Sequence, residues 1–168
     1  MMNHAMTESS FDLSFRRHLD VSKELIWRAW TEPELLKIWF CPRPWKTVHC
    51  EIDLRAGGIF KTIMQSPQGD LFPNESCFLE IEKNKQLVWT NSLLPGFRPN
   101  QVANLGQEDN AFFFTATIHL EDHVGGTTYT ASVKHADEAS CNKHKAMGFE
   151  QGWGIALDQL IEMLRQGI

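Results

Sequence analysis

The sequence of 168 residues predicts an α+β fold in which a curved antiparallel sheet of about seven strands surrounds a long C-terminal helix. Three observations favour this fold class. Apolar and polar residues alternate in several short segments that turns separate, two short helical patterns follow the first of these segments, and the chain ends in an amphipathic pattern of helical period. We expect residues 11–168 to form one domain and residues 1–10 to be a disordered tail.

The N-terminal part of the domain is predicted to be one strand followed by two short helices. The strand covers residues 11–19, where apolar residues alternate with polar ones. Ser22 is a suitable cap for the first helix, because apolar residues recur after it at helical spacing. Thr31 together with Pro33 is expected to begin the second helix, which ends near Trp39.

Six further strands are expected between the two short helices and the terminal helix. A hairpin turns at residues 55–58, whose two glycines are expected to supply the positive φ of a tight turn. Two strands lie on either side of residues 82–86, and two more on either side of residues 125–126. Short turns join antiparallel neighbours, so the strands form a meander. Residues 95–109 show no clear period and are expected to form a functional lid.

The terminal helix is predicted over residues 147–164 and carries glycines at unexpected positions. Its broad apolar stripe indicates that it lies across the sheet. Gly152 and Gly154 fall at the two margins of this stripe, although an interior glycine costs about 1 kcal/mol relative to alanine. They allow either close packing of the helix on the strands or a hollow beside Trp153, and the sequence leaves both open.

The composition excludes several classes of function. The net charge is −5 and no basic run is present, which argues against binding to nucleic acid or to an anionic membrane. No segment approaches the roughly 20 apolar residues of a membrane span, and the N-terminus lacks the pattern of a signal peptide, so we expect a cytoplasmic protein. The four cysteines are scattered, as expected of reduced thiols. No phosphate loop, dinucleotide fingerprint or nucleophile elbow is present, and no cofactor is expected.

A few polar residues could carry chemistry. His135, Cys141 and His144 lie close together in the sequence, but their spacing matches no standard zinc pattern, so no metal site is predicted. Glu150 lies at the margin of the apolar stripe, where it would be either a buried acid with a raised pKa or a carboxylate that reaches water or pairs with Arg98. No catalytic residue is identified, and His135 with Glu150 is the candidate acid–base pair.

The order of elements resembles the helix-grip fold of the START and polyketide-cyclase (SRPBCC) superfamily. Within it, several segments are similar to those of small proteins resembling the C-terminal domain of the heat-shock-protein-90 ATPase activator (AHSA-like): IWRAWTEPELLKIWF, DLRAGGIF, QLVWTN, LLPGFRP, GGTTYTASVKH and MGFEQGWGIALDQL. The similarity spans residues 11–164. It implies a curved sheet and a helix that hold a small apolar molecule between them. The activators carry an extra N-terminal domain that has no counterpart here, so a chaperone partner is not implied.

The resemblance, combined with strand alternation, gives a set of expected site residues. The predicted cavity wall comprises Trp39, Phe60, Thr62, Met64, Trp89, Phe114, Tyr129, Phe149, Trp153 and Leu157. The polar groups expected to orient the ligand are Thr62, Arg98, His135 and Glu150.

Three functions are consistent with the sequence. The first is non-catalytic binding of a small apolar or aromatic molecule. The second is an enzyme of the cyclase or hydrolase kind that uses the same cavity, and the third is a protein-interaction domain with a filled core. Edge strands could in addition pair two copies into a homodimer.

Overall fold

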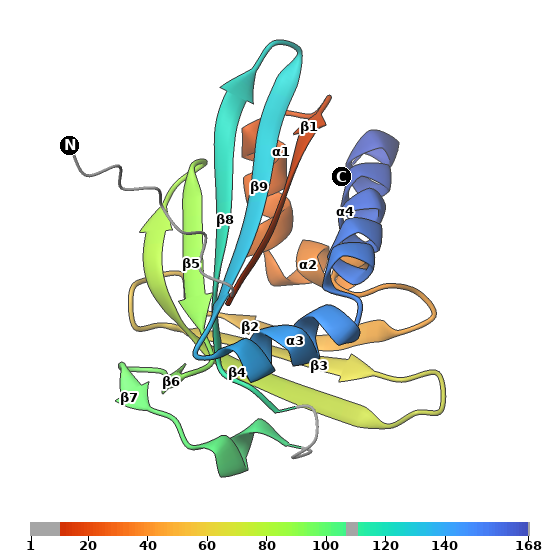
Figure 1. Ribbon diagram of the computed structural model, residues 1–168. Coiled ribbons are helices and arrows are strands. Elements are labelled where there is room, and N and C mark those ends of the chain that lie inside the picture. Colours follow the sequence, from red (N-terminus) through yellow and green to blue (C-terminus); the bar gives the residue numbers. More distant parts are fainter. Residues whose placement is uncertain (1–10, 107–110, 168) are drawn as a thin grey trace, which may run out of the picture.

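The computed structural model describes residues 11–106 and 111–167 and confirms the α+β class (Figure 1). The predicted tail at residues 1–10 lies outside the described residues. The strands of the main sheet are β1 (Asp12–Leu19), β2 (Lys46–Ile52), β3 (Ile59–Gln65), β4 (Leu71–Glu82), β5 (Gln86–Thr90), β8 (Phe114–His123) and β9 (Gly126–His135). The helices are α1 (Lys23–Thr31), α2 (Pro33–Trp39), α3 (Glu138–Ala146) and α4 (Phe149–Gln166).

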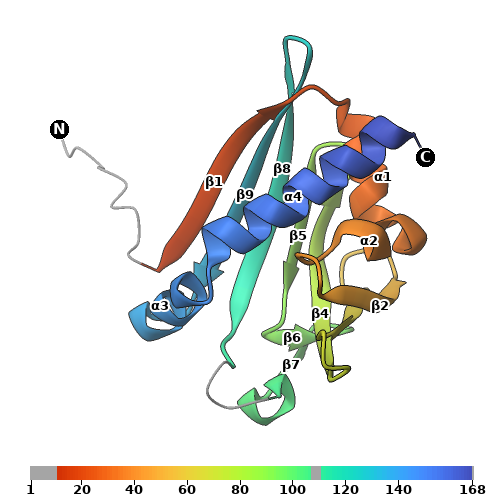
Figure 2. The ribbon, with the colours of Figure 1, turned by 90° about the vertical axis from the view of Figure 1, so that its right-hand side faces the viewer.

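The seven strands form one antiparallel sheet in the order β1-β9-β8-β5-β4-β3-β2, as the meander predicts. Two irregularities in the register, at Thr47/His49 and at Phe78/Glu80, are β-bulges, which increase the local bend of a strand. The helix α4 crosses one face of the sheet, and α1 and α2 lie beside its C-terminal half (Figures 1 and 2). The core lies between this face and the helices.

The two N-terminal helices form where they are predicted, with one change at their junction. The Ser22 side chain accepts a hydrogen bond from the backbone N–H of Leu25 at 3.3 Å and caps α1. Thr31 does not begin α2 as expected. It ends α1, where its hydroxyl donates to the Trp27 carbonyl at 2.7 Å, and Glu32 is the residue before Pro33 at the start of α2.

The glycine pair at the β2–β3 hairpin has two different roles. Gly57 has φ +81°, the positive value that the sequence predicts. Gly58 does not have a positive φ, and here the prediction is wrong. A Cβ at Gly58 would lie 2.0 Å from the Asp53 carbonyl oxygen, so this position needs glycine for a close backbone approach.

The C-terminal region contains two helices instead of one. The helix α3 was not predicted, and its N-cap Asp137 accepts a hydrogen bond from the Ser140 backbone N–H at 2.7 Å. Its buried side chains are Cys141 and His144, which face inward together because they are three residues apart. Gly148, with φ +84°, separates α3 from α4.

Between β5 and β8 the chain forms short elements in the segment predicted to be a lid. These are the two-residue strands β6 (Leu93–Leu94) and β7 (Arg98–Pro99) and the 3₁₀ helix η1 (Val102–Leu105). Residues 107–110 of this segment lie outside the described residues. None of the helices in the described part of the chain is long and apolar enough to cross a membrane.

The glycines at the start of α4 predict substitutions with opposite effects. Gly154→Ala should raise the free energy of unfolding by about 1 kcal/mol, because alanine favours a helix and the new Cβ meets no atom within 4 Å. Gly148→Ala should lower it by about 1 to 2 kcal/mol, because the left-handed conformation is unfavourable with a Cβ. Urea denaturation of both variants measures these changes. A change in the free energy of unfolding with the same sign in both variants would contradict the different roles given to Gly148 and Gly154.

Candidate functional site

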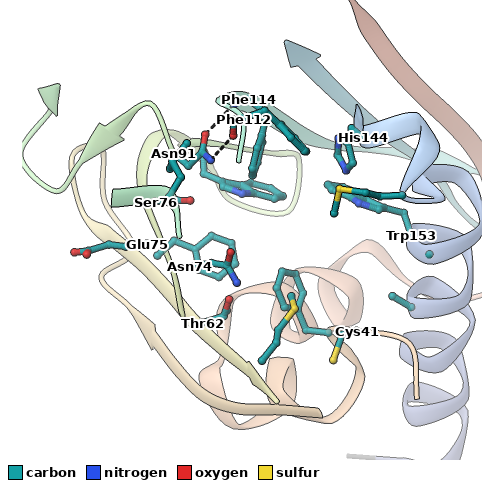
Figure 3. A pocket seen from close by; sticks show the side chains of 18 of the residues that line it. Cys41, Thr62, Asn74, Glu75, Ser76, Asn91, Phe112, Phe114, His144 and Trp153 are labelled. Carbon is teal, nitrogen blue, oxygen red and sulfur yellow. Dashed lines mark hydrogen bonds between the residues drawn. The ribbon is translucent and has the colours of Figure 1, made fainter. Parts of the chain in front are cut away.

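A cavity of about 810 Å³ lies between the sheet and the N-terminal half of α4 (Figure 3). Its wall contains residues of β3, β4, β5, β8 and β9 on the sheet side, and of α1, α2 and α4 on the helix side. The volume falls in the range of about 300 to 1,000 Å³ that is typical of small-molecule sites.

The cavity wall contains many aromatic side chains. Phe149 and Trp153 project from α4 with ring centroids 5.1 Å apart. The ring of Trp89, on β5, is parallel to that of Trp153 within 4°, at a centroid distance of 6.4 Å. The other aromatic side chains of the wall are Trp30, Trp39, Phe40, Phe60, Phe112, Phe114, Tyr129 and His144.

Gly152 helps to keep this space open. It lines the cavity, and a Cβ built on it would meet no atom within 4 Å. Gly154 also faces open space but does not line the cavity. Of the two explanations for these glycines, close packing of the helix on the strands is therefore wrong, and Gly152 borders a hollow.

The wall on β3 and β4 carries polar side chains beside apolar ones. Thr62 pairs with Asn74 and Phe60 with Ser76 in the register of these strands, which brings the two hydroxyls and the amide to one side of the cavity. Glu75 is at the rim, and its carboxylate points away from the space between the labelled side chains (Figure 3). Among the described residues of the wall there is no lysine or arginine.

Two histidines form a hydrogen-bonded pair at the edge of the cavity. His144 lines the cavity, and its Nδ1 lies 3.0 Å from Nε2 of His135. The Nδ1 atom of His135 lies 2.6 Å from the carbonyl oxygen of Phe11, the residue before β1. Both side chains are buried. The pair therefore links the first strand to the cavity through β9 and α3.

Burial favours the neutral forms of three titratable groups of the cavity wall. It lowers the pKa of His144 to about 4, with a further contribution from the neighbouring His135. Burial also raises the pKa of the Tyr129 hydroxyl and of the Cys41 thiol. The nearby indole N–H of Trp30 partly offsets this rise in the pKa of Tyr129, but it does not form a hydrogen bond with the Tyr129 hydroxyl.

Asn91 holds the segment that enters β8. Its side-chain Oδ1 accepts a hydrogen bond from the Phe114 backbone N–H at 2.8 Å, and its Nδ2 donates to the Phe112 carbonyl at 2.9 Å. Figure 3 shows both contacts beside the rings of Phe112 and Phe114. Asn91 therefore positions two aromatic side chains of the cavity wall.

Nine of the thirteen residues predicted for the site line this cavity. They are Trp39, Phe60, Thr62, Met64, Trp89, Phe114, Tyr129, Phe149 and Trp153. Their role in ligand binding stays a prediction. Leu157 does not line the cavity, because it is 1% exposed in the core farther along α4.

The three remaining residues do not take the positions expected from the sequence. Glu150 is exposed, since it lies about 100° around the helix from Phe149 and no element covers that side of the first turn. Arg98 is exposed on β7, and no ion pair joins it to Glu150. His135 is buried but contacts His144 instead of Glu150, so the structure does not bring the expected acid–base pair together.

Several residues of the cavity were missed. Phe112 lies two residues before Phe114, and the alternation along this strand would have placed it on the same face. Ser76 was missed because the strand before residues 82–86 was expected to begin at Cys77, whereas β4 begins at Leu71. His144 was considered only as a metal ligand, and the described residues contain no group of three side chains that could hold a metal ion.

The fold and the cavity together define a protein of the helix-grip, START-like class. The chain belongs to the family described as "Activator of Hsp90 ATPase homolog 1-like protein", whose model matches residues 20–165. No protein with a curated description matches the chain.

Solved structures agree with this assignment. A protein of Nitrosomonas europaea is 43% identical, with a TM-score of 0.87 over 95% of this chain and 97% of its own. Proteins with lower identity share the fold. One of Rhodobacter sphaeroides is 21% identical, with a TM-score of 0.77 over 95% of each chain. The AHSA1-like protein of Aeromonas hydrophila is 18% identical, with a TM-score of 0.67 over 92% of each chain.

Asn91→Ala should lower the free energy of unfolding by about 1 to 3 kcal/mol, because it leaves the Phe114 N–H and the Phe112 carbonyl without their partner. Asn91→Asp, which keeps the acceptor and loses the donor, should have a smaller effect. Urea denaturation measures both. Equal stability of Asn91→Ala and the unsubstituted protein would show that these contacts do not hold the segment.

The lowered pKa of His144 predicts a pH dependence of stability. The unfolded chain binds this proton with the ordinary pKa of 6.5, whereas the folded chain resists it until about pH 4. Stability should therefore fall as the pH decreases from about 6.5 to about 4, by up to about 3 kcal/mol from this group.

His144→Asn isolates this contribution, because the amide can still donate to His135 but does not titrate. The measurement is the difference in free energy of unfolding between the two proteins across this pH range. A difference that does not change with pH would contradict the lowered pKa.

Proposed function

We propose that this protein binds a small, largely apolar or aromatic molecule in the cavity between the sheet and α4. The observation that carries the proposal is the 810 Å³ space with an aromatic wall on one side and a few polar groups on the other. Ligand sites in general combine such walls with a small number of polar groups that fix orientation. The family of the chain supports the proposal only at the level of the fold.

The open cavity also favours binding over the alternatives. A protein-interaction domain with a filled core would not need a glycine facing empty space at position 152. An enzyme of the cyclase or hydrolase kind is the second candidate, but the acid–base pair expected for it, His135 with Glu150, is not assembled in the cavity. Binding without chemistry accounts for the arrangement with the fewest additional requirements.

Filling the cavity from α4 tests the proposal. Gly152→Phe should weaken the binding of naphthalene-type probes at least about tenfold, because the new side chain enters the space that the probe would occupy. Gly154→Phe is the matched control, since it adds the same group to the same helix away from the cavity. Quenching of tryptophan fluorescence by 2-methoxynaphthalene and by 2-naphthol measures the affinities.

Two results would contradict the proposal. One is that neither probe binds to the unsubstituted protein. The other is that both glycine variants bind the probes as well as the unsubstituted protein does, which would place the bound probe elsewhere.

A further inference from the structure

We propose that the molecule held in this cavity is a neutral aromatic compound with a hydroxyl group, whose O–H donates a hydrogen bond to Nε2 of His144. The inference rests on the proposed function and specifies the ligand class. It follows from the directions of the hydrogen bonds in the histidine pair, the surroundings of His144 and the charges of the cavity wall.

The hydrogen-bond directions follow from the Phe11 carbonyl, which can only accept. The Nδ1 atom of His135, 2.6 Å away, must therefore carry a proton and donate it. In a neutral imidazole the other nitrogen is then an acceptor, so Nε2 of His135 accepts from Nδ1–H of His144 at 3.0 Å. By the same rule, Nε2 of His144 carries no proton. It is an acceptor and cannot donate.

This acceptor is open to the cavity. Among the described residues, no hydrogen bond to Nε2 of His144 is formed. Nε1 of Trp30 is the only fully buried side-chain nitrogen or oxygen of these residues that lacks a partner, so Nε2 of His144, which also lacks one, is not fully buried. Nε2 of His144 is therefore accessible, and the space beside this residue is the cavity. Figure 3 shows the His144 ring at the edge of this space, next to Trp153.

The surroundings of His144 favour a flat aromatic ligand. Its ring centroid lies 4.9 Å from that of Phe112, 5.1 Å from that of Phe149 and 6.2 Å from that of Trp153. A ligand that fills this space displaces the water that would otherwise satisfy Nε2. An unpaired buried acceptor costs about 1 to 3 kcal/mol, so a ligand that donates a hydrogen bond here is favoured over one that does not.

The charges of the wall disfavour an anionic ligand. The described residues that line the cavity include no lysine or arginine, and the neutral His144 offers an anion no proton. A carboxylate or phosphate in the cavity would lose its hydration without gaining a counter-charge, which is costly. A neutral hydroxyl can use both the acceptor at His144 and the polar side chains Thr62 and Ser76 across the cavity.

Three probes of similar shape test the ligand class by isothermal titration calorimetry at pH 7.5. They are 2-naphthol, which has a neutral hydroxyl group, 2-methoxynaphthalene, which has no donor, and 2-naphthoate, which is an anion. We expect 2-naphthol to bind about tenfold more tightly than 2-methoxynaphthalene, and 2-naphthoate to bind most weakly. Equal affinities of 2-naphthol and 2-methoxynaphthalene, or tightest binding of 2-naphthoate, would overturn the inference.

Substitution of the histidine locates the effect. His144→Phe keeps a ring but removes both nitrogens, so 2-naphthol should lose its advantage over 2-methoxynaphthalene. His49→Phe is the matched control, because His49 is exposed on β2 away from the cavity, and the advantage should persist. An advantage that survives in a folded His144→Phe protein would overturn the assignment to His144.

A spectroscopic measurement on the unsubstituted protein covers the case in which His144→Phe does not fold. Nitrogen-15 NMR of the imidazoles should show protonated Nδ1 and unprotonated Nε2 in both His135 and His144. The Nε2 resonance of His144 should shift when 2-naphthol is added. A proton on Nε2 of His144, or no shift at saturation, would overturn the inference.

The experiments separate the failure of this inference from the failure of the proposed function. If both neutral probes bind with equal affinity and Gly152→Phe weakens both, the cavity is a binding site but the ligand class is wrong. If no probe binds to the unsubstituted protein, both proposals are overturned.

Discussion

The position of α4 depends on Gln159, a buried amide with 7% of its surface exposed. Its Nε2 donates to the carbonyl oxygens of Trp39 at 3.0 Å and Cys41 at 2.7 Å, and its Oε1 accepts from the backbone N–H of Arg43 at 3.0 Å. Because a buried amide that loses its partners costs about 1 to 3 kcal/mol, these bonds favour one rotation and one height of α4 over the connection between α2 and β2. The N-terminal half of the helix is thereby held above the sheet, and the cavity is the space that remains.

The two halves of α4 therefore have different roles in the structure. In the C-terminal half, Leu157, Leu160 and Leu164 are buried and close the core. In the N-terminal half, aromatic rings face an open space, and the dispersion contacts that a packed interior would supply are missing there. Gly152 adds the lower helix propensity of glycine, about 1 kcal/mol relative to alanine. Stability comes from one half of the helix and the cavity from the other.

Residue patterns predict the sheet and part of the cavity wall, because alternation assigns Phe60, Thr62 and Met64 to one face without knowledge of the rest of the structure. Residue patterns do not predict the burial of a side chain where that burial depends on how far a neighbouring helix or strand extends. Glu150 has nearly the same angular position on α4 as the buried Leu157, but this side of the first turn is exposed. The polar sequence of α3 gives little amphipathic signal, although Asp137 followed by Glu138 is a recognisable helix start. Without α3, the contact between His135 and His144 could not be foreseen.

The burial that makes the cavity apolar also fixes its electrostatics. Burial disfavours the charged forms of His144, Tyr129 and Cys41, so discrimination between ligands in the proposed site would depend on the direction of hydrogen bonds instead of on the charge of these groups. That direction originates at the Phe11 carbonyl, which accepts from both the backbone N–H of His135 at 3.0 Å and its side-chain Nδ1. The pairing of the chain before β1 with the end of β9 therefore determines which nitrogen of His144 faces the cavity without a proton. The polarity of the proposed ligand site is set by the residue that precedes the outermost strand of the sheet, outside the wall of the cavity.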